Sequence, residues 1–179
     1  MRLSEIADRL GSLEGQEADE IHIRLRNPLF KGMLQGESVR SRNSPADYPA
    51  RELIRARLLM AMFDCGLSTT ELSEVNSELN SERGFTGPSG ETIARTGLDL
   101  ISDGTAAGQS WVIFLRFTRM KGQRWLHAAI YEDKDDAKFG KLDVTQLVSK
   151  GRSATEFGGT HLMTSVVPAS DLIRPLLES

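Results

Sequence analysis

Apolar residues recur at helical spacing over most of the segment 48–79. A largely apolar run covers 51–63, and Gly66 behind it can adopt the left-handed conformation that ends a helix. Ser68 and Glu71 then have the spacing of a capping box, in which two side chains satisfy backbone donors at a new helix start. The pattern therefore predicts two helices joined by a short turn. The apolar positions of the turn and of the second helix are Leu67, Leu72, Val75 and Leu79.

Two shorter helices are predicted before this pair. The first begins with Ser4 as its cap and is expected to stop at Gly11. The second must end by Asn27, because Pro28 lacks a backbone N–H and restricts the residue before it. Its apolar stripe consists of Ala18, Ile21 and Leu25. A short helix, a turn and a second helix are the layout of a helix-turn-helix.

The pattern changes after the helical part of the chain. Turn-forming residues are concentrated in 80–90, which predicts a long loop or a boundary, and a domain edge is placed near here. A helix is predicted over 92–101, stopping near Gly104. The clearest β signal follows, with strands at 111–118 and 125–131 joined by a tight turn. Because both strands carry apolar residues on both faces, the sheet is expected to be covered on each side.

The last part of the chain adds one more strand and two helices to this picture. The strand is predicted at 161–167, and Pro168 starts a short helix with apolar residues up to Leu177. A further short helix is expected at 143–148, with Asp143 as its cap. Helices followed by antiparallel strands predict an α+β fold.

The order of parts in roughly the first 80 residues resembles the MerR type of winged helix-turn-helix regulator. That family has a first helix with a Glu-(Ile/Val)-Ala pattern, a recognition helix, a Lys-Gly-Leu-Leu-like exit, a basic wing closing on a tyrosine, and a helix pair with a Gly-Leu-Ser junction. The matching pieces here are Glu5-Ile6-Ala7, Lys31-Gly32-Met33-Leu34, 40–48 and 66–72.

This resemblance implies a particular division of the chain and a particular function. A MerR-like winged helix-turn-helix DNA-binding domain is expected at 1–82, and an α+β dimerisation or effector domain at 83–179. The implied function is a sequence-specific transcriptional regulator that binds double-stranded DNA as a dimer. Such a protein is expected in the cytoplasm, associated with the nucleoid, with the transcription machinery as a further partner.

The distribution of charge favours a local contact with phosphate. The chain has 179 residues and a formal net charge of −3, yet the segment 22–57 carries eight basic residues and three acidic ones, which gives +5. Affinity for nucleic acid depends on the field at the contact surface rather than on the total charge. The basic residues of the segment are Arg24, Arg26, Lys31, Arg40, Arg42, Arg51, Arg55 and Arg57.

Helical periodicity assigns roles to several of these side chains. With the apolar stripe of the second helix turned inward at about 100° per residue, His22, Ile23 and Arg26 point outward and Arg24 lies at the flank. We expect Arg26 to reach a base edge, and Arg24 and Lys31 to contact phosphate. Turn-forming residues place two arginines on an exposed loop, and a tyrosine hydroxyl beside it can donate to phosphate. The expected DNA-binding set is His22, Arg24, Arg26, Lys31, Arg40, Arg42 and Tyr48.

A dimer is expected because a single small module reads few base pairs, so such proteins usually bind two half-sites as a symmetric pair. The long dimerising helix of the family is not evident after Leu79. The segment 161–177 is therefore expected to supply the interface.

Other chemistry is not indicated by the sequence. There is no phosphate-loop pattern, no dinucleotide glycine fingerprint and no zinc-ligand spacing, so neither an enzyme, a cofactor nor a metal is expected. His127 and His161 could share a metal across adjacent strands, with Glu132 or Asp133 nearby, but paired strand histidines are more often structural. The single cysteine, Cys65, excludes an intrachain disulfide and is expected to be buried.

Composition leaves a second class of function open. Hydrophobic residues make up 39% and charged residues 26%, a normal globular balance, and no apolar run approaches the roughly 18 to 20 residues that cross a membrane. A protein-interaction adaptor, whose N-terminal helices dock on a partner protein while the arginines are solvated, fits the same helices. Salt dependence separates it from a DNA-binding protein, since phosphate contacts release counterions.

Overall fold

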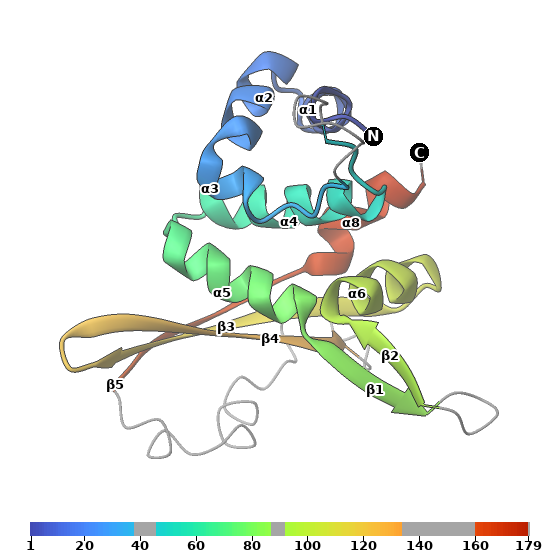
Figure 1. Cartoon of the computed structure of the whole chain (residues 1–179). Helices are drawn as coiled ribbons and strands as arrows, with labels where there is room; N and C mark the ends of the chain where they lie inside the picture. The colour runs from blue at the N-terminus through green and yellow to red at the C-terminus, as the bar shows by residue number, and fades with distance from the viewer. Residues whose placement is uncertain (38–45, 87–91, 134–159, 179) are drawn as a thin grey trace. The chain divides into compact units, whose positions relative to one another are not determined.

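The computed structural model describes residues 1–37, 46–86, 92–133 and 160–178. Within these residues the chain is α+β, as predicted, with seven helices and two antiparallel sheets (Figure 1). The helices are α1 (Leu3–Glu14), α2 (Ala18–Arg26), α3 (Pro28–Lys31), α4 (Arg51–Asp64), α5 (Thr69–Asn80), α6 (Gly97–Ala106) and α8 (Ala169–Leu177). The strands are β1 (Glu82–Thr86), β2 (Thr92–Thr96), β3 (Ser110–Met120), β4 (Gln123–Asp133) and β5 (Thr160–Val167).

The chain divides into two compact units. Unit 1 comprises Met1–Asn76 together with Leu172–Ser179, and unit 2 comprises Ser77–Asp171. The last turns of the chain therefore belong to the helical unit, although the strand before them belongs to the other.

The first helix of unit 1 differs from its prediction at both ends. It begins at Leu3, so Ser4 lies inside the helix, and the carboxylate of Glu5 accepts the backbone N–H of Arg2 at 3.0 Å. The helix also continues through Gly11 and ends at Gly15, whose φ of 65° is left-handed. The predicted start was wrong because the Glu5 carboxylate caps the helix ahead of Ser4. The predicted end was wrong because Gly11 allows close packing against the residues that follow the helix and does not end it.

The second helix and the central helix pair of unit 1 follow their predictions. Helix α2 ends at Arg26, and Pro28 opens the short α3, which the sequence pattern did not indicate. Gly66 has a φ of 89° after α4. The backbone N–H and the hydroxyl of Ser68 both donate to Glu71 Oε2 at 2.8 Å, so the predicted capping box is confirmed. Cys65 is exposed, contrary to prediction, because it caps α4 on the solvent side of the turn.

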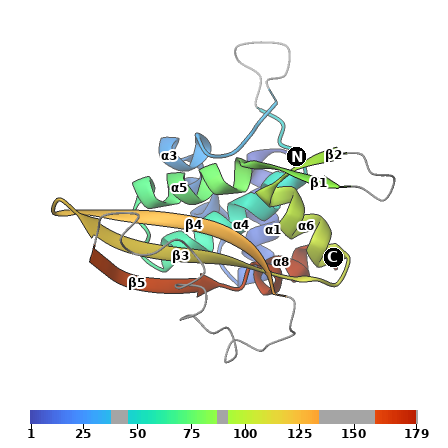
Figure 2. The same ribbon diagram turned by 90° about the horizontal axis from the view of Figure 1, so that it is seen from below.

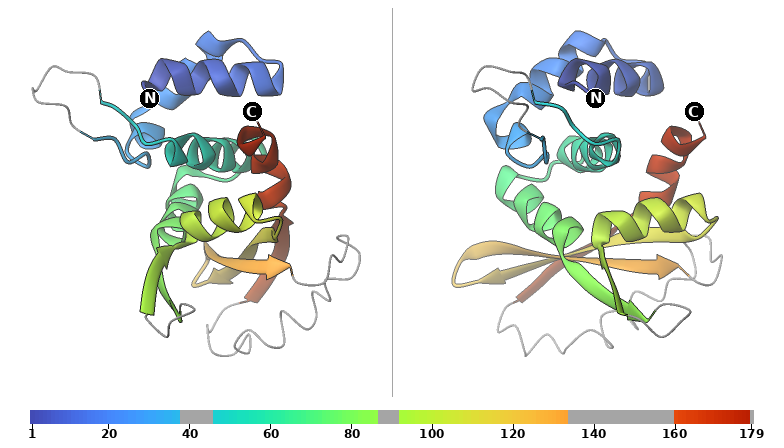
Figure 3. Two further views of the ribbon diagram at one scale, coloured as in Figure 1. Left: turned by 90° about the vertical axis from the view of Figure 1, so that its right-hand side faces the viewer. Right: turned by 45° about the vertical axis from the view of Figure 1, so that its right-hand side comes forward.

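Unit 2 begins with a hairpin that the sequence analysis missed. Strands β1 and β2 pair antiparallel and lead directly into α6 (Figure 3). The expected loop at 80–90 thus contains β1, and the first half of the helix expected at 92–101 is β2. The break is set by Thr96, whose hydroxyl accepts the N–H of Asp99 at 3.1 Å and starts the helix there instead.

The second sheet of unit 2 has β3 at its centre. The strand order is β4-β3-β5, and all pairs are antiparallel (Figure 2). The predicted hairpin is confirmed, with a turn at Lys121 and Gly122. Coverage on both faces holds for β3, which is buried from Trp111 to Thr118. It is wrong for β4, where only Leu126 and Ile130 are buried and Trp125 is 46% exposed.

Two predicted features lie outside the described residues. These are the helix at 143–148 and the loop of Arg40 and Arg42. The third strand is confirmed as β5, and the helix after Pro168 as α8.

Candidate nucleic-acid interface

Helices α1 and α2 are joined by the three residues 15–17 and approach each other closely. The backbone N–H of Gln16 donates to the carbonyl of Gly11 at 3.1 Å. A Cβ atom at position 11 would lie 2.8 Å from Gln16 O and 3.2 Å from the Cα of Ala18. Gly11 therefore allows the backbones of the two helices to touch, and its missing side chain, together with left-handed Gly15, fixes their crossing.

The inner face of α2 is the apolar stripe that the sequence predicted. Ile21 and Leu25 have no exposed surface, whereas Ile23 is 72% exposed. Arg26 is exposed, as expected for an outward position, and His22 is half-buried. Lys31, in α3, is exposed too.

Arg24, the flanking position of α2, already has a partner within unit 1. Its Nη1 lies 3.1 Å from Oδ1 of Asp64, at the end of α4, and both side chains are partly exposed. Such an exposed pair contributes little stability and is screened by salt, so a phosphate could displace the carboxylate. The pair nevertheless reduces the positive charge that Arg24 presents.

The first turn of α2 carries two exposed carboxylates, Asp19 and Glu20. They are favourable for the helix itself, since its N-terminus has a partial positive charge. They also oppose the approach of phosphate to that end of the helix. Positive charge on the outer surface of α2 is therefore concentrated at its C-terminal end, near Arg26.

Within the segment that joins α3 to α4, two residues ten positions apart, Glu37 and Asp47, are held side by side. Glu37 and Asp47 form an isolated antiparallel bridge, with Glu37 N–H donating to Asp47 O at 2.7 Å and Asp47 N–H to Glu37 O at 3.3 Å. Next to it, Tyr48 N–H donates to the carbonyl of Met1 at 2.7 Å, and the N-terminal amine of Met1 donates to the carbonyl of Tyr48 at 2.8 Å. Glu37 and Asp47, which flank the segment that carries Arg40 and Arg42, are thus held next to each other.

Tyr48 lies at the base of this loop rather than on its surface. Only 5% of the residue is exposed, and Gly36 lies so close that a Cβ there would be 2.9 Å from the tyrosine Cε1. Burial, and then the negative charge of Glu52, raise the pKa of the Tyr48 hydroxyl, so the neutral form is favoured. The buried ring offers little surface to a phosphate.

A buried ion pair supports the same region, and sequence reasoning missed it. Glu52 has no exposed surface and Arg55 has 2%. Arg55 Nε lies 2.9 Å from Glu52 Oε2, which also accepts the backbone N–H of Gln35 at 2.9 Å. Arg55 Nη1 donates to Asn76 Oδ1 at 2.6 Å. The pair thus connects the segment before the loop with α4 and α5.

Two arginines of α4 are removed from the basic segment by such pairing. Arg55 is buried, and Arg57 is 11% exposed with its Nη2 3.2 Å from Glu14 Oε1. The sequence count of +5 over 22–57 therefore overstates the charge available to an external ligand.

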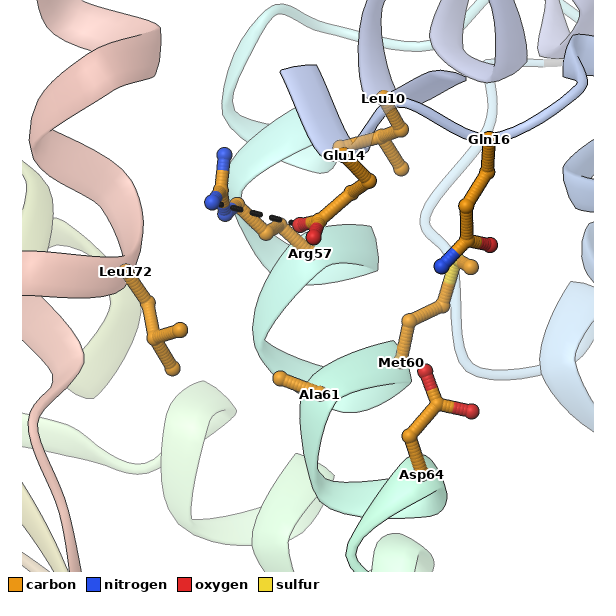
Figure 4. Close-up of a pocket in the computed structure, with 8 residues that line it drawn as sticks. All are labelled: Leu10, Glu14, Gln16, Arg57, Met60, Ala61, Asp64 and Leu172. Carbon is orange, nitrogen blue, oxygen red and sulfur yellow. Dashed lines mark ion pairs between the residues drawn. The ribbon is translucent and has the colours of Figure 1, made fainter. Parts of the chain in front are cut away.

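Arg57 also lines a cavity of unit 1, with a volume of about 100 Å³ (Figure 4). Burial lowers the pKa of the Arg57 guanidinium, and the charge of Glu14 opposes this shift. The cavity is enclosed by Leu10, Glu14, Gln16, Arg57, Met60, Ala61, Asp64 and Leu172. One cation and two carboxylates leave the cavity without a preference for an anion.

Apolar side chains are exposed in the same unit. Ile23 is 72% exposed, Leu29 52% and Phe63 43%, and the Phe63 ring packs edge-to-face against Phe30 at a centroid distance of 5.7 Å. Exposed large apolar side chains are one feature of surfaces that contact another protein.

The described residues hold no group of three or more His, Cys, Asp and Glu side chains placed to bind a metal. His127 and His161 are not on adjacent strands, because β3 lies between β4 and β5. His127 is opposite Arg116, and His161 is opposite Thr118. No helix among the described residues is long and apolar enough to cross a membrane.

Comparisons of the chain with protein-family models, with curated proteins and with solved structures find no match.

Proposed function

We propose that unit 1 binds double-stranded DNA as a winged helix-turn-helix of the MerR type, in a transcriptional regulator that acts as a dimer. The observation that carries this proposal is the combination of a glycine-mediated α1–turn–α2 crossing with a loop whose two ends are paired at Glu37 and Asp47. A helix pair with a three-residue glycine turn is the layout of helix-turn-helix proteins. A wing is a loop that projects from the domain, so the backbone on its two sides has to be paired, as Glu37 and Asp47 are.

The proposed contacts follow from exposure and charge. Arg26 reads a base edge, because it is exposed at the end of α2 that lacks carboxylates. Lys31, and Arg24 after release from Asp64, contact phosphate, while His22 lines the same surface. Arg40 and Arg42 reach the DNA backbone from the loop, and Tyr48 holds the loop base. A regulator of this kind works at the nucleoid, in the cytoplasm, with the transcription machinery.

The experiment that tests the proposal is a gel shift against random duplex pools, followed by sequencing of the retained DNA and a salt titration. DNA binding should weaken steeply as salt rises, because each phosphate contact releases counterions. Failure to retain any duplex at low salt would overturn the proposal.

Arg26→Ala should relax the sequence preference at one position and weaken specific binding by about 1 to 3 kcal/mol. The reason is the loss of a bidentate contact with the O6 and N7 atoms of a guanine. Competition between matched and singly altered duplexes measures the effect. Arg95→Ala in unit 2, an exposed arginine paired with Asp103 at 3.1 Å, is the control and should leave affinity unchanged. Equal weakening for all duplexes would instead make Arg26 a phosphate contact.

Replacing both Arg40 and Arg42 with alanine should weaken specific and non-specific duplexes alike. Two lost phosphate contacts reduce the slope of log affinity against log salt by about 1.8, since each contributes roughly 0.9. Fluorescence anisotropy at several salt concentrations measures this slope. If the slope does not change, the loop does not contact DNA, and the assignment of this loop as a wing is wrong.

Exposure of Ile23, Leu29 and Phe63 favours a second candidate, an adaptor whose helical unit docks on a protein. Binding through such a surface is mainly apolar and depends weakly on salt. Substituting Leu29 with serine should then abolish partner binding, whereas a DNA-binding protein of the proposed type would keep its salt slope.

A further inference from the structure

The three-stranded sheet of unit 2 has two edges, and they differ in how they are protected. Strand β3 is central, so β4 and β5 each have one side without a strand neighbour among the described residues (Figure 2). An edge strand presents backbone N–H and C=O groups that another strand can pair with. Proteins usually block such edges with charge, proline or side-chain caps.

The β4 edge is capped at Ile130 by side chains of the same unit. Glu78 Oε1 accepts the backbone N–H of Ile130 at 3.3 Å, and Arg83 Nη1 donates to the carbonyl of Ile130 at 3.1 Å. Arg83 and Glu78 are also ion-paired with each other. This pair occupies the donor and the acceptor that an incoming strand would use, and it places charge beside them.

Within the described parts of the chain, the β5 edge has none of these devices. Its eight residues, Thr160–Val167, include no Asp, Glu, Lys, Arg or Pro, and the strand pairs with β3 alone. Leu162 is 40% exposed and Met163 50%. A register shift at Phe117/Thr118 leaves Leu162 without a partner residue on β3, and from Met163 to Val167 the ladder is regular.

We propose that β5 pairs antiparallel with β5 of a second copy of this chain. The occupant follows from self-complementarity, because an antiparallel pair of identical strands brings the same uncharged surface together twice around a two-fold axis. A chain with one open and one capped edge closes at two copies and cannot grow into a filament. The sheet of the dimer would run β4-β3-β5 in one copy and continue through β5-β3-β4 of the other.

This interface deepens the proposed function, which requires a dimer, but its test needs no DNA. Sedimentation equilibrium of the full chain at micromolar concentrations should show a dimer. Met163→Lys should raise the dimer dissociation constant at least tenfold, since two like charges meet near the two-fold axis. The matched control is Trp125→Lys, at a similarly exposed position of β4. It should remain dimeric, and circular dichroism should show that both variants are folded.

Disulfide trapping gives a second readout that does not depend on dissociation. In a Cys65→Ser background, a cysteine replaces each residue from 162 to 166 in turn. Antiparallel two-fold pairing places one position, or two adjacent ones, opposite its own copy, so cross-linking should peak there and fall on both sides. A cysteine at Tyr131 of β4 should cross-link at background level.

Three results would overturn the proposal. They are a monomer at all concentrations, a dimer that survives Met163→Lys without a peak of cross-linking in β5, and trapping through Tyr131. A dimer that forms as described but retains no duplex would leave the interface in place and remove the proposed DNA binding. A monomer that binds DNA would do the reverse.

Discussion

Replacing Arg55 with methionine should lower the free energy of unfolding of unit 1 by about 3 to 5 kcal/mol. Arg55 is 2% exposed and pairs with Glu52, which has no exposed surface. Removing the guanidinium leaves a carboxylate buried without its ion partner, and such a charge is much more costly than the pair. Denaturant unfolding followed by circular dichroism measures the difference.

Two further variants separate this explanation from loss of packing. Arg51→Ala removes an exposed arginine 4.0 Å from Glu52 Oε1 and should change stability by less than about 0.5 kcal/mol. The double variant Glu52→Gln with Arg55→Met removes both charges and keeps an acceptor for the N–H of Gln35, so it should recover most of the loss. If the double variant were as unstable as Arg55→Met alone, the buried charge would not be the cause.

The pair also has a consequence for the proposed DNA contact. Glu52 holds the backbone of Gln35, which precedes the paired loop base at Glu37 and Asp47. Weakening the pair should therefore loosen the backbone at Gln35 and Glu37 before the unit unfolds. Hydrogen exchange at the amides of Gln35 and Glu37 reports this local opening.

Elements fixed by local chemistry could be predicted from the sequence. The turn between α4 and α5 depends on Gly66 and on the Ser68–Glu71 box, and each acts within a few residues. The end of α2 depends on Pro28 alone. The hairpin of β3 and β4 is a run of β-branched and aromatic residues around one tight turn.

Elements that depend on packing or pairing between neighbouring segments were missed. Gly11 has the composition signal of a helix end, but it is glycine because Gln16 and Ala18 pack against its backbone. The strands β1 and β2 are five residues each and lack clear alternation, so only their pairing with each other defines them.

The candidate interface was only partly predictable for a related reason. Exposure of Arg26 follows from helical periodicity in α2. Burial of Arg55 and of Tyr48 does not, since periodicity cannot show which charged residue finds a buried partner or which aromatic ring supports a loop. A glutamate three residues before an arginine in an apolar helix, as in Glu52 and Arg55, is the signal that was present and was read as surface charge.

Gly97→Ala should destabilise unit 2 by about 1 to 3 kcal/mol, through overpacking where the backbone cannot move aside. A Cβ at position 97 would lie 2.6 Å from the backbone carbonyl oxygen of Glu78 and would also collide with the side chain of Ile130. Gly97 is the first residue of α6, and its N–H donates to Ser81 O at 3.2 Å, so the helix start is held against this carbonyl. Thermal and denaturant unfolding measure the loss. Ser102→Ala in the same helix is the control and should stay within about 0.5 kcal/mol of the parent.

The same substitution should also change assembly, because the residue that must move is the one that caps the β4 edge. Displacing Glu78 frees the N–H of Ile130 and loosens Arg83 from its carbonyl. A chain with two open edges can pair at both, so Gly97→Ala should form species larger than a dimer, and the amide of Ile130 should exchange faster. The variant Glu78→Ala opens the edge without the steric clash and should give the same species with a smaller loss of stability. If Gly97→Ala is destabilised but Glu78→Ala keeps the parent's assembly state, the Glu78–Arg83 cap does not protect the sheet, and the contrast between its two edges loses its physical basis.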